Sequence, residues 1–318
     1  MNTLYIIGNG FDVAHGLKTQ YWELRKYIEN KDPDFLTEFE KIYDIFPLDD
    51  TEPWYTDDAQ EQWNKSVDKI LWSAFESSMG NPNINEMLEW STSVTEDMPT
   101  IGIQDHMDNY WRREFGFINK LQKYVKEWIE TINTDKIQCK KADLMNSNDL
   151  FLNFNYTDIL EKVYKIKNVV HIHGGVSSVC DTNPMMGHCN KEDIIKHRQW
   201  AKEALDEFLE AETSIQNAIA NYLETIYKDT NRQIALNRDF FEKLSAVENV
   251  IIIGWSAGDV DIPYLVEITN HIRKKQVHWT LYWYDDIAYQ SLKHSLEKVG
   301  IDNSGNVDYI QSSLFWDR

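Results

Sequence analysis

Cysteine is scarce in this sequence: only Cys139, Cys180 and Cys189 occur in 318 residues, and no two of them form a Cys-x-x-Cys pair. Three irregularly spaced cysteines do not support a disulfide framework, so we expect a protein of the reducing cytoplasm. The stretch from Cys180 to Cys189 also holds Asp181 and His188. Its spacing matches no familiar zinc pattern, and we therefore expect no bound metal.

Positive charge and long apolar runs are lacking as well. The chain has 52 acidic and 32 basic residues, which gives a net charge of −20. Such a surface repels nucleic-acid phosphates and anionic lipid, and no dense basic run reverses the field locally. No apolar run reaches transmembrane length, and no basic leader with a cleavage site precedes the first strand. We therefore expect an intracellular protein that binds neither membranes nor nucleic acid directly.

Apolar and aromatic residues, by contrast, are plentiful. Hydrophobic residues make up 42% of the chain and aromatic residues 13%, including 12 Trp and 16 Tyr. This composition indicates a well-packed globular protein rather than a disordered one. The length suits one large α/β domain with an insertion or two domains of ordinary size.

Short apolar runs, most of them ending in glycine or a polar residue, predict the strands. We expect strands at Leu4–Ile7, Leu150–Asn155, Val169–Gly175, Val250–Ile253, Trp279–Tyr284 and Val307–Ile310. Helical patterns separate them, so the fold class is α/β, with a doubly wound, mostly parallel six-stranded sheet. We predict a single domain over residues 1–318, with large helical insertions at about 34–135 and 190–245. The aromatic residues of these insertions suit core packing, and they also offer contacts for a homo-oligomer.

The first strand runs into the motif Gly8-Asn9-Gly10-Phe11-Asp12. Glycine permits backbone angles that other residues avoid, and it lets a ligand approach the main chain, so amides here are able to face a phosphate. Taken alone, however, G-x-G also describes an ordinary tight turn. Other parts of the chain must decide between the two interpretations.

Ligands of doubly wound sheets bind beyond the carboxyl ends of the strands. The candidate residues at these ends are Gly8, Asn9, Gly10, Asp12, Asn155, Tyr156, Asp158, His173, Gly174, Gly254, Ser256, Asp259 and Asp285. A single histidine or asparagine after a strand is usually structural. Their convergence on one edge of the sheet favours a binding site.

Four of these segments, taken in order, resemble a known family. The motifs are G-N-G-F-D, L-N-F-N-Y-T-D-I-L-E, V-H-I-H-G and I-I-I-G-W-S-A-G-D. Together they resemble the AbiH group of bacterial phage-defence proteins, which is similar to SIR2-like NAD-binding domains more broadly. The resemblance implies a Rossmann-like pocket and an abortive-infection effector that hydrolyses NAD to nicotinamide and ADP-ribose.

The resemblance also implies roles for individual residues. Asn155 would hold the nicotinamide ribose and position a water molecule, and His173 would act as a general base at the ribose hydroxyls. The turn from Gly8 to Gly10 would lie against the phosphates. The other cofactor-binding residues implied are Asn9, Asp12, Tyr156, Gly174, Gly254, Ser256, Asp259 and Asp285, with Asp285 at the adenosine ribose. The four-cysteine zinc module of sirtuin deacetylases is missing, and we do not expect protein deacetylation.

Asp12 fits this scheme least well, because a carboxylate beside a pyrophosphate repels it unless it points at the ribose or at a helix amide. One alternative is therefore a sensor or adaptor that binds NAD or a related nucleotide without cleaving it. Another is a metal-dependent nuclease built from Asp12, Asp158, Asp259 and Asp285. The expected partners also include a phage-derived trigger and a second defence protein.

Overall fold

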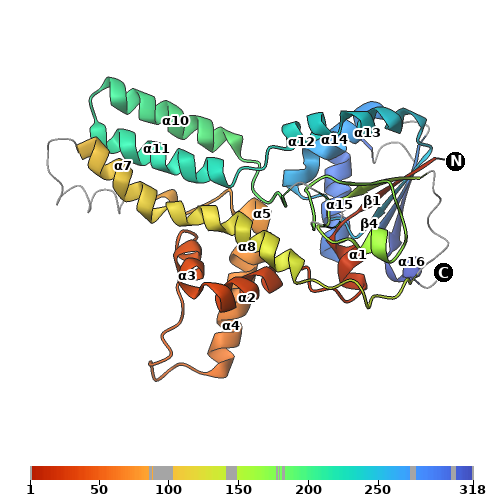
Figure 1. Cartoon of the computed structure of the whole chain (residues 1–318), viewed down its shortest axis with the longest axis horizontal. Helices are drawn as coiled ribbons and strands as arrows, with labels where there is room; N and C mark the ends of the chain where they lie inside the picture. Colours follow the sequence, from red (N-terminus) through yellow and green to blue (C-terminus); the bar gives the residue numbers. More distant parts are fainter. Residues whose placement is uncertain are drawn as a thin grey trace. The chain divides into compact units, whose positions relative to one another are not determined.

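The computed structural model describes residues 2–85, 88, 103–140, 149–176, 178, 180, 183–272, 277–301 and 306–316. The chain divides into two compact units (Figure 1). The α/β unit comprises Met1–Gln20, Val125–Met185 and Asp229–Arg318, and the helical unit comprises Tyr21–Tyr124 and Met186–Lys228. In the described part of the chain, no helix combines the length and apolar character that a membrane span requires.

The α/β unit is built on a parallel sheet of six strands in the order β3-β2-β1-β4-β5-β6. The strands are β1 (Thr3–Ile7), β2 (Leu150–Asn153), β3 (Val169–His171), β4 (Asn249–Ile253), β5 (His278–Trp283) and β6 (Val307–Gln311). The predicted fold class is therefore confirmed. After β1 the chain moves outward to β2 and β3 and then returns to place β4 on the other side of β1. The junction of β1 and β4 is thus the topological switch point, where ligands of such sheets bind.

Successive side chains of each strand point to opposite faces of the sheet. Both faces are buried, each in its own hydrophobic core. Leu4 and Ile6 join one core, and Tyr5 and Ile7 join the other. The first core includes side chains of α12 (Thr230–Leu236), α13 (Arg238–Lys243), α14 (Ile262–His271) and α15 (Asp286–Lys298). The second includes side chains of α1 (Asn9–Ala14), α9 (Ile159–Lys162) and α16 (Ser313–Trp316). Helices on both faces make this unit a doubly wound fold.

Further α-helices in the described residues are α2 (Tyr21–Lys31), α3 (Pro33–Lys41), α4 (Asp57–Val67), α5 (Phe75–Ser78), α7 (Ile103–Glu114), α8 (Asn119–Glu130), α10 (Lys191–Asp206) and α11 (Glu210–Thr225). Two breaks interrupt stretches of the helical insertions in which the apolar residues keep helical spacing. The stretch from Trp111 to Ile129 is interrupted at Gly116, where a short 3-10 turn separates α7 from α8. Glycine is a poor helix former, which accounts for the break. The stretch from Lys191 to Lys228 turns at Phe208, and α10 and α11 pack against each other (Figure 1).

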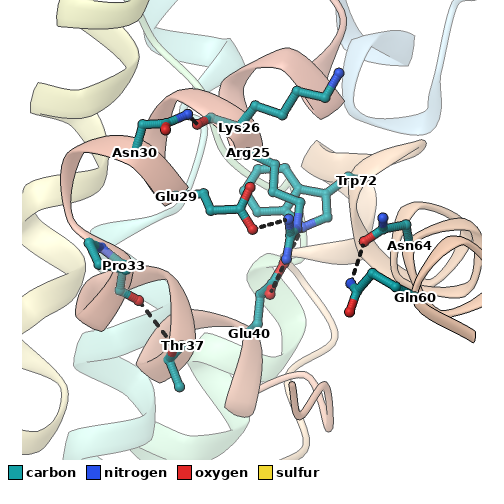
Figure 2. Close-up of polar contacts among 10 residues, drawn as sticks. All are labelled: Arg25, Lys26, Glu29, Asn30, Pro33, Thr37, Glu40, Gln60, Asn64 and Trp72. Carbon is teal, nitrogen blue, oxygen red and sulfur yellow. Dashed lines mark hydrogen bonds and ion pairs between the residues drawn. The ribbon is translucent and has the colours of Figure 1, made fainter. Parts of the chain in front are cut away.

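A buried charge network ties α2 to α3 in the helical unit (Figure 2). Arg25 donates from Nε and Nη2 to the two carboxylate oxygens of Glu40, at 2.8 and 3.0 Å. Trp72 Nε1 donates to the same carboxylate at 2.7 Å. The side chains of Arg25 and Glu40 are only 4% and 5% exposed. A two-pronged pair of this kind satisfies both charges in a place that water does not reach.

We predict that Glu40→Gln destabilises the protein by about 3 kcal/mol, because it leaves the Arg25 guanidinium buried without its main counter-charge. Glu29→Gln is the matched control, since Glu29 accepts from the same guanidinium at 3.1 Å but has a side chain that is 52% exposed. It should cost less than about 1 kcal/mol. Urea unfolding of both variants measures the difference, and equal losses would contradict the assignment.

Candidate functional site

Three glycines bring the first turn into backbone contact with the end of β4. Gly8 N donates to Ile253 O at 2.9 Å, and Gly10 N donates to Gly254 O at 2.8 Å. A Cβ atom on Gly8 would lie 2.4 Å from Trp255 Cα, and one on Gly254 would lie 2.3 Å from Phe11 N. Gly254 also has a φ of +64°, in the left-handed region that favours glycine. The amides of Gly8 and Gly10 are thus already engaged within the protein, so these two N–H groups do not form a phosphate cradle.

Asp12 lies fully buried in α1, directly after this turn. Its carboxylate accepts hydrogen bonds from Asn155 Nδ2 at 2.8 Å and from Thr157 Oγ1 at 2.7 Å. Burial raises the pKa of Asp12 from 3.8 to about 7, and the two hydrogen bonds offset part of that rise. A carboxyl group in this position is not exposed to a ligand phosphate. Asp12 therefore acts on Asn155, and the repulsion anticipated from the sequence does not arise.

Asn155, beyond the end of β2, is held from three sides. Its Nδ2 donates both to Asp12 and, at 3.0 Å, to Gly8 O. Its main-chain N donates to Asn153 Oδ1 at 3.0 Å, and its main-chain O lies 3.1 Å from His171 Nδ1. With the amide nitrogen committed to two acceptors, the orientation of the side-chain amide is set. In the described part of the chain, Asn155 Oδ1 is buried and accepts no hydrogen bond. Such an atom is a natural acceptor for a ligand hydroxyl or a water molecule.

His173, beyond the end of β3, lies in an aromatic and acidic setting. Its Nε2 is 3.5 Å from Asp261 Oδ1, and Trp255 Nε1 donates to the other oxygen of that carboxylate at 3.1 Å. The rings of Phe154 and Tyr264 contact the imidazole, with centroids at 5.1 and 5.4 Å. The carboxylate and the two rings together help to orient the imidazole.

Phe154 connects the two candidate residues. It precedes Asn155 in the chain, contacts His173 edge-on and stacks on Trp255, with ring centroids at 4.6 Å. The ends of β2, β3 and β4 therefore meet beside the switch point. Four residues that contact Asp12, Asn155 or His173, or their neighbour Phe154, were not among the candidates from the sequence. They are Thr157, His171, Trp255 and Asp261. Asp261 lies two residues beyond the predicted Asp259, and its position after β4 was the available signal.

The other predicted residues have local structural contacts or exposed positions instead. Asn9 Nδ2 donates to Thr19 O and Tyr156 Oη donates to Met185 O, both at 3.0 Å. Asp259 pairs with Lys298 at 2.9 Å, and Asp285 caps α15 by accepting from Ala288 N at 2.8 Å. Gly174 has a φ of +75°, and Ser256 is exposed. Asn9, Tyr156, Asp259 and Asp285 thus have partners within the protein. The core of the site is accordingly Asn155 and His173 with the residues that hold them.

The four aspartates of the nuclease alternative have separate partners. Asp158 pairs with Lys162 at 3.0 Å and accepts from Ser178 at 2.8 Å, whereas Asp12 accepts from Asn155 and Thr157. Over the described ranges, no three His, Cys, Asp or Glu side chains gather as metal ligands. Asp181, in the stretch from Cys180 to Cys189, lies outside the described residues. The geometry of the described residues therefore does not favour a metal-dependent nuclease.

A cavity of 370 Å³ lies in the helical unit, lined by residues of α7, α10 and α11. Much of its polar lining is paired internally. Arg198 donates to Glu224 at 2.7 Å, to Asn217 at 2.8 Å and to Asn221 at 2.6 Å. Because these groups are already satisfied, we place the candidate functional site at the sheet edge of the α/β unit.

The burial of Asp12 predicts a pH dependence of stability. Its pKa is about 7 in the folded chain and about 4 in an unfolded one. Protonated Asp12 therefore adds to the free energy of unfolding. This contribution is fully present below about pH 4 and is lost as the pH rises through 7. Between pH 5 and pH 8, the wild type should lose about 3 kcal/mol of unfolding free energy relative to Asp12→Asn.

Urea unfolding at the two pH values measures this difference. Asp259→Asn is the matched control, because the Asp259 side chain is 71% exposed. That variant should follow the wild type at both pH values. A constant offset between the wild type and Asp12→Asn would show that Asp12 does not titrate in this range.

The family comparison agrees with the motifs that meet at this edge. No curated protein and no solved structure is a significant match to the chain. The family model described as "Bacteriophage abortive infection AbiH" matches residues 4–283, which run from the second residue of β1 to the end of β5. Membership of that family implies a role in phage abortive infection. The chain therefore belongs to the bacteriophage abortive infection AbiH family.

Proposed function

We propose that this AbiH-family chain hydrolyses NAD to nicotinamide and ADP-ribose at the sheet edge formed by Asn155 and His173. The observation that carries the proposal is the buried Asn155 Oδ1, which accepts no hydrogen bond from the described residues. It lies beside the switch point of a doubly wound sheet, where such folds bind nucleotides. Depletion of NAD after infection would arrest the host cell and so stop the phage.

The donors and acceptors present suit the ribose half of NAD. Asn155 Oδ1 is an acceptor for a ribose hydroxyl or for the attacking water. The His173 imidazole, with Asp261 3.5 Å away, suits a base whose cation is stabilised by a carboxylate. The phosphate half has to be held by groups other than the Gly8 and Gly10 amides, because those donate to Ile253 O and Gly254 O.

The proposed reaction breaks the bond between C1′ of the ribose and the nicotinamide nitrogen. The bonding electrons leave with nicotinamide, which departs as a neutral molecule, and positive charge develops on the ribose. A water molecule held by Asn155 Oδ1 attacks C1′, and His173 accepts the proton that this water loses. A dry setting strengthens each of these interactions, and the side chains of Asn155 and His173 are largely buried.

Asp12 has a positioning role in this scheme. Its carboxylate and Gly8 O both attract Asn155 Nδ2, so the amide oxygen, and not the amide nitrogen, remains for the substrate. With a pKa near 7, Asp12 changes protonation in the physiological range. Ionised Asp12 is a stronger acceptor for Asn155 Nδ2 than protonated Asp12. We therefore expect the orientation of the Asn155 amide to be best maintained above the pKa of Asp12.

The burial that favours chemistry also supports a second candidate function. Asn155 and His173 are 4% and 3% exposed. A nucleotide sensor or adaptor that binds NAD and passes a conformational change to a partner would also keep such residues inside. This candidate requires binding without cleavage.

We predict that the purified protein releases nicotinamide and ADP-ribose from NAD, alone or after addition of phage lysate. Asn155→Ala and His173→Ala should each lower the rate by about 100-fold or more, since each removes a group that acts on the attacking water. Chromatography of the products measures the rate. Circular dichroism verifies that the variants are folded.

Two variants with the same residue changes elsewhere in the α/β unit serve as controls. Asn237→Ala removes a side chain that donates to Gln233 O within α12 and its C-cap, and His278→Ala removes a side chain that is 48% exposed. Both should retain the wild-type rate. Tight binding of intact NAD in calorimetry, without product under either condition, would replace hydrolysis with the sensor function.

A further inference from the structure

Figure 1 shows the turn between α10 and α11 in the helical unit. Large apolar side chains at this turn are exposed. Phe208 is 89% exposed, the highest value among the large hydrophobic side chains of the described residues. Leu205 and Leu209, on either side, are 52% and 49% exposed. We call these three residues the turn cluster. An aromatic ring this exposed contributes little to the stability of the fold.

The backbone at Phe208 is also unfavourable for its residue type. Phe208 N donates to Leu205 O at 3.1 Å, and Leu209 N donates to Ala204 O at 2.8 Å. This pair of bonds is the helix-ending motif whose left-handed position is normally glycine. Phe208 occupies that position with a φ of +60°. A residue with a side chain costs about 1 kcal/mol there, so both the conformation and the exposure of Phe208 count against the stability of the isolated chain.

The surroundings of the turn cluster are strongly acidic. The exposed carboxylates near it in the sequence are Glu203, Asp206, Glu207, Glu210 and Glu212. No lysine or arginine occurs from residue 203 to residue 227. A second copy of the chain would bring a like-charged turn to the contact, and an anionic membrane would repel it. A cationic protein surface is the complementary partner.

We propose that the turn cluster is a docking site for a basic protein that has an apolar recess for Phe208. A protruding aromatic side chain that fills a pocket is a typical interface hot spot. The surrounding carboxylates would steer the partner and set the register of the contact. The proposal is independent of NAD hydrolysis, because it rests on the helical unit.

The test measures two effects of one substitution separately, namely the thermal stability of the chain and its binding to the partner. Phe208→Gly relieves the backbone and removes the ring, so the variant should unfold at the same temperature as the wild type or a higher one, while docking is lost. Asp44→Gly is the matched control in the same unit. Asp44 is exposed, has a φ of +61° and ends α3 with the same two bonds, from Asp44 N to Lys41 O at 3.0 Å and from Ile45 N to Glu40 O at 3.1 Å. Phe208→Asn, which also tolerates this conformation, is the second variant if Phe208→Gly does not fold.

The partner is identified by photo-crosslinking in phage-infected cells, with benzoylphenylalanine placed at position 208 or at position 44. We expect position 208 alone to capture a basic protein, and the double variant Glu207→Lys and Glu210→Lys to abolish the capture. With that protein purified, Phe208→Gly should weaken binding by at least about 10-fold, and Asp44→Gly should leave it unchanged. Capture of a second copy, equal capture from both positions, no capture, or unchanged binding by Phe208→Gly would each overturn the proposal.

Discussion

The close approach of two backbone turns at the switch point is the constraint on which the α/β unit depends. Ile7 and Ile253 pair in register, and the chain after each strand must then turn within hydrogen-bonding distance of the other. Only glycine fits, because a Cβ on Gly8, Gly10 or Gly254 would come within 2.7 Å of the facing backbone. This contact places Asp12 beneath the turn. It also leaves Gly8 O available to Asn155 from β2.

Burial then decides what the polar groups at this edge are able to do. Asp12 has an ordinary carboxyl group in the sequence, but in the folded chain burial raises its pKa to about 7, and the hydrogen bonds from Asn155 and Thr157 offset only part of that rise. Its effect is to orient an amide whose oxygen remains open to a ligand. His173 is held in place in a comparable way, by Asp261 and by the aromatic rings of Phe154 and Tyr264. The chemistry of the site therefore comes from how residues are held as much as from their identity.

In the helical unit, some charged side chains are buried, whereas a large apolar side chain is exposed. Arg25 and Glu40 are buried and paired, and Lys228, fully buried, lies 3.0 Å from both carboxylate oxygens of Glu76. Charges removed from water in this way need their partners to keep the unit folded. At the turn cluster, by contrast, Phe208 stands exposed among unburied carboxylates. A surface with that composition is explained by recognition better than by folding.

The parallel α/β class, the strand positions and the family follow from the sequence alone, because short apolar runs, glycine turns and the four ordered motifs are local signals. The same signals singled out Asn155 and His173 as candidate site residues. The helix breaks at Gly116 and Phe208 do not stand out in the sequence, because the apolar spacing continues across them. The engagement of the glycine amides, the burial of Asp12 and the role of Asp261 depend on residues far apart in the chain. Long-range packing sets which groups are dry and which are paired, and no local pattern encodes that.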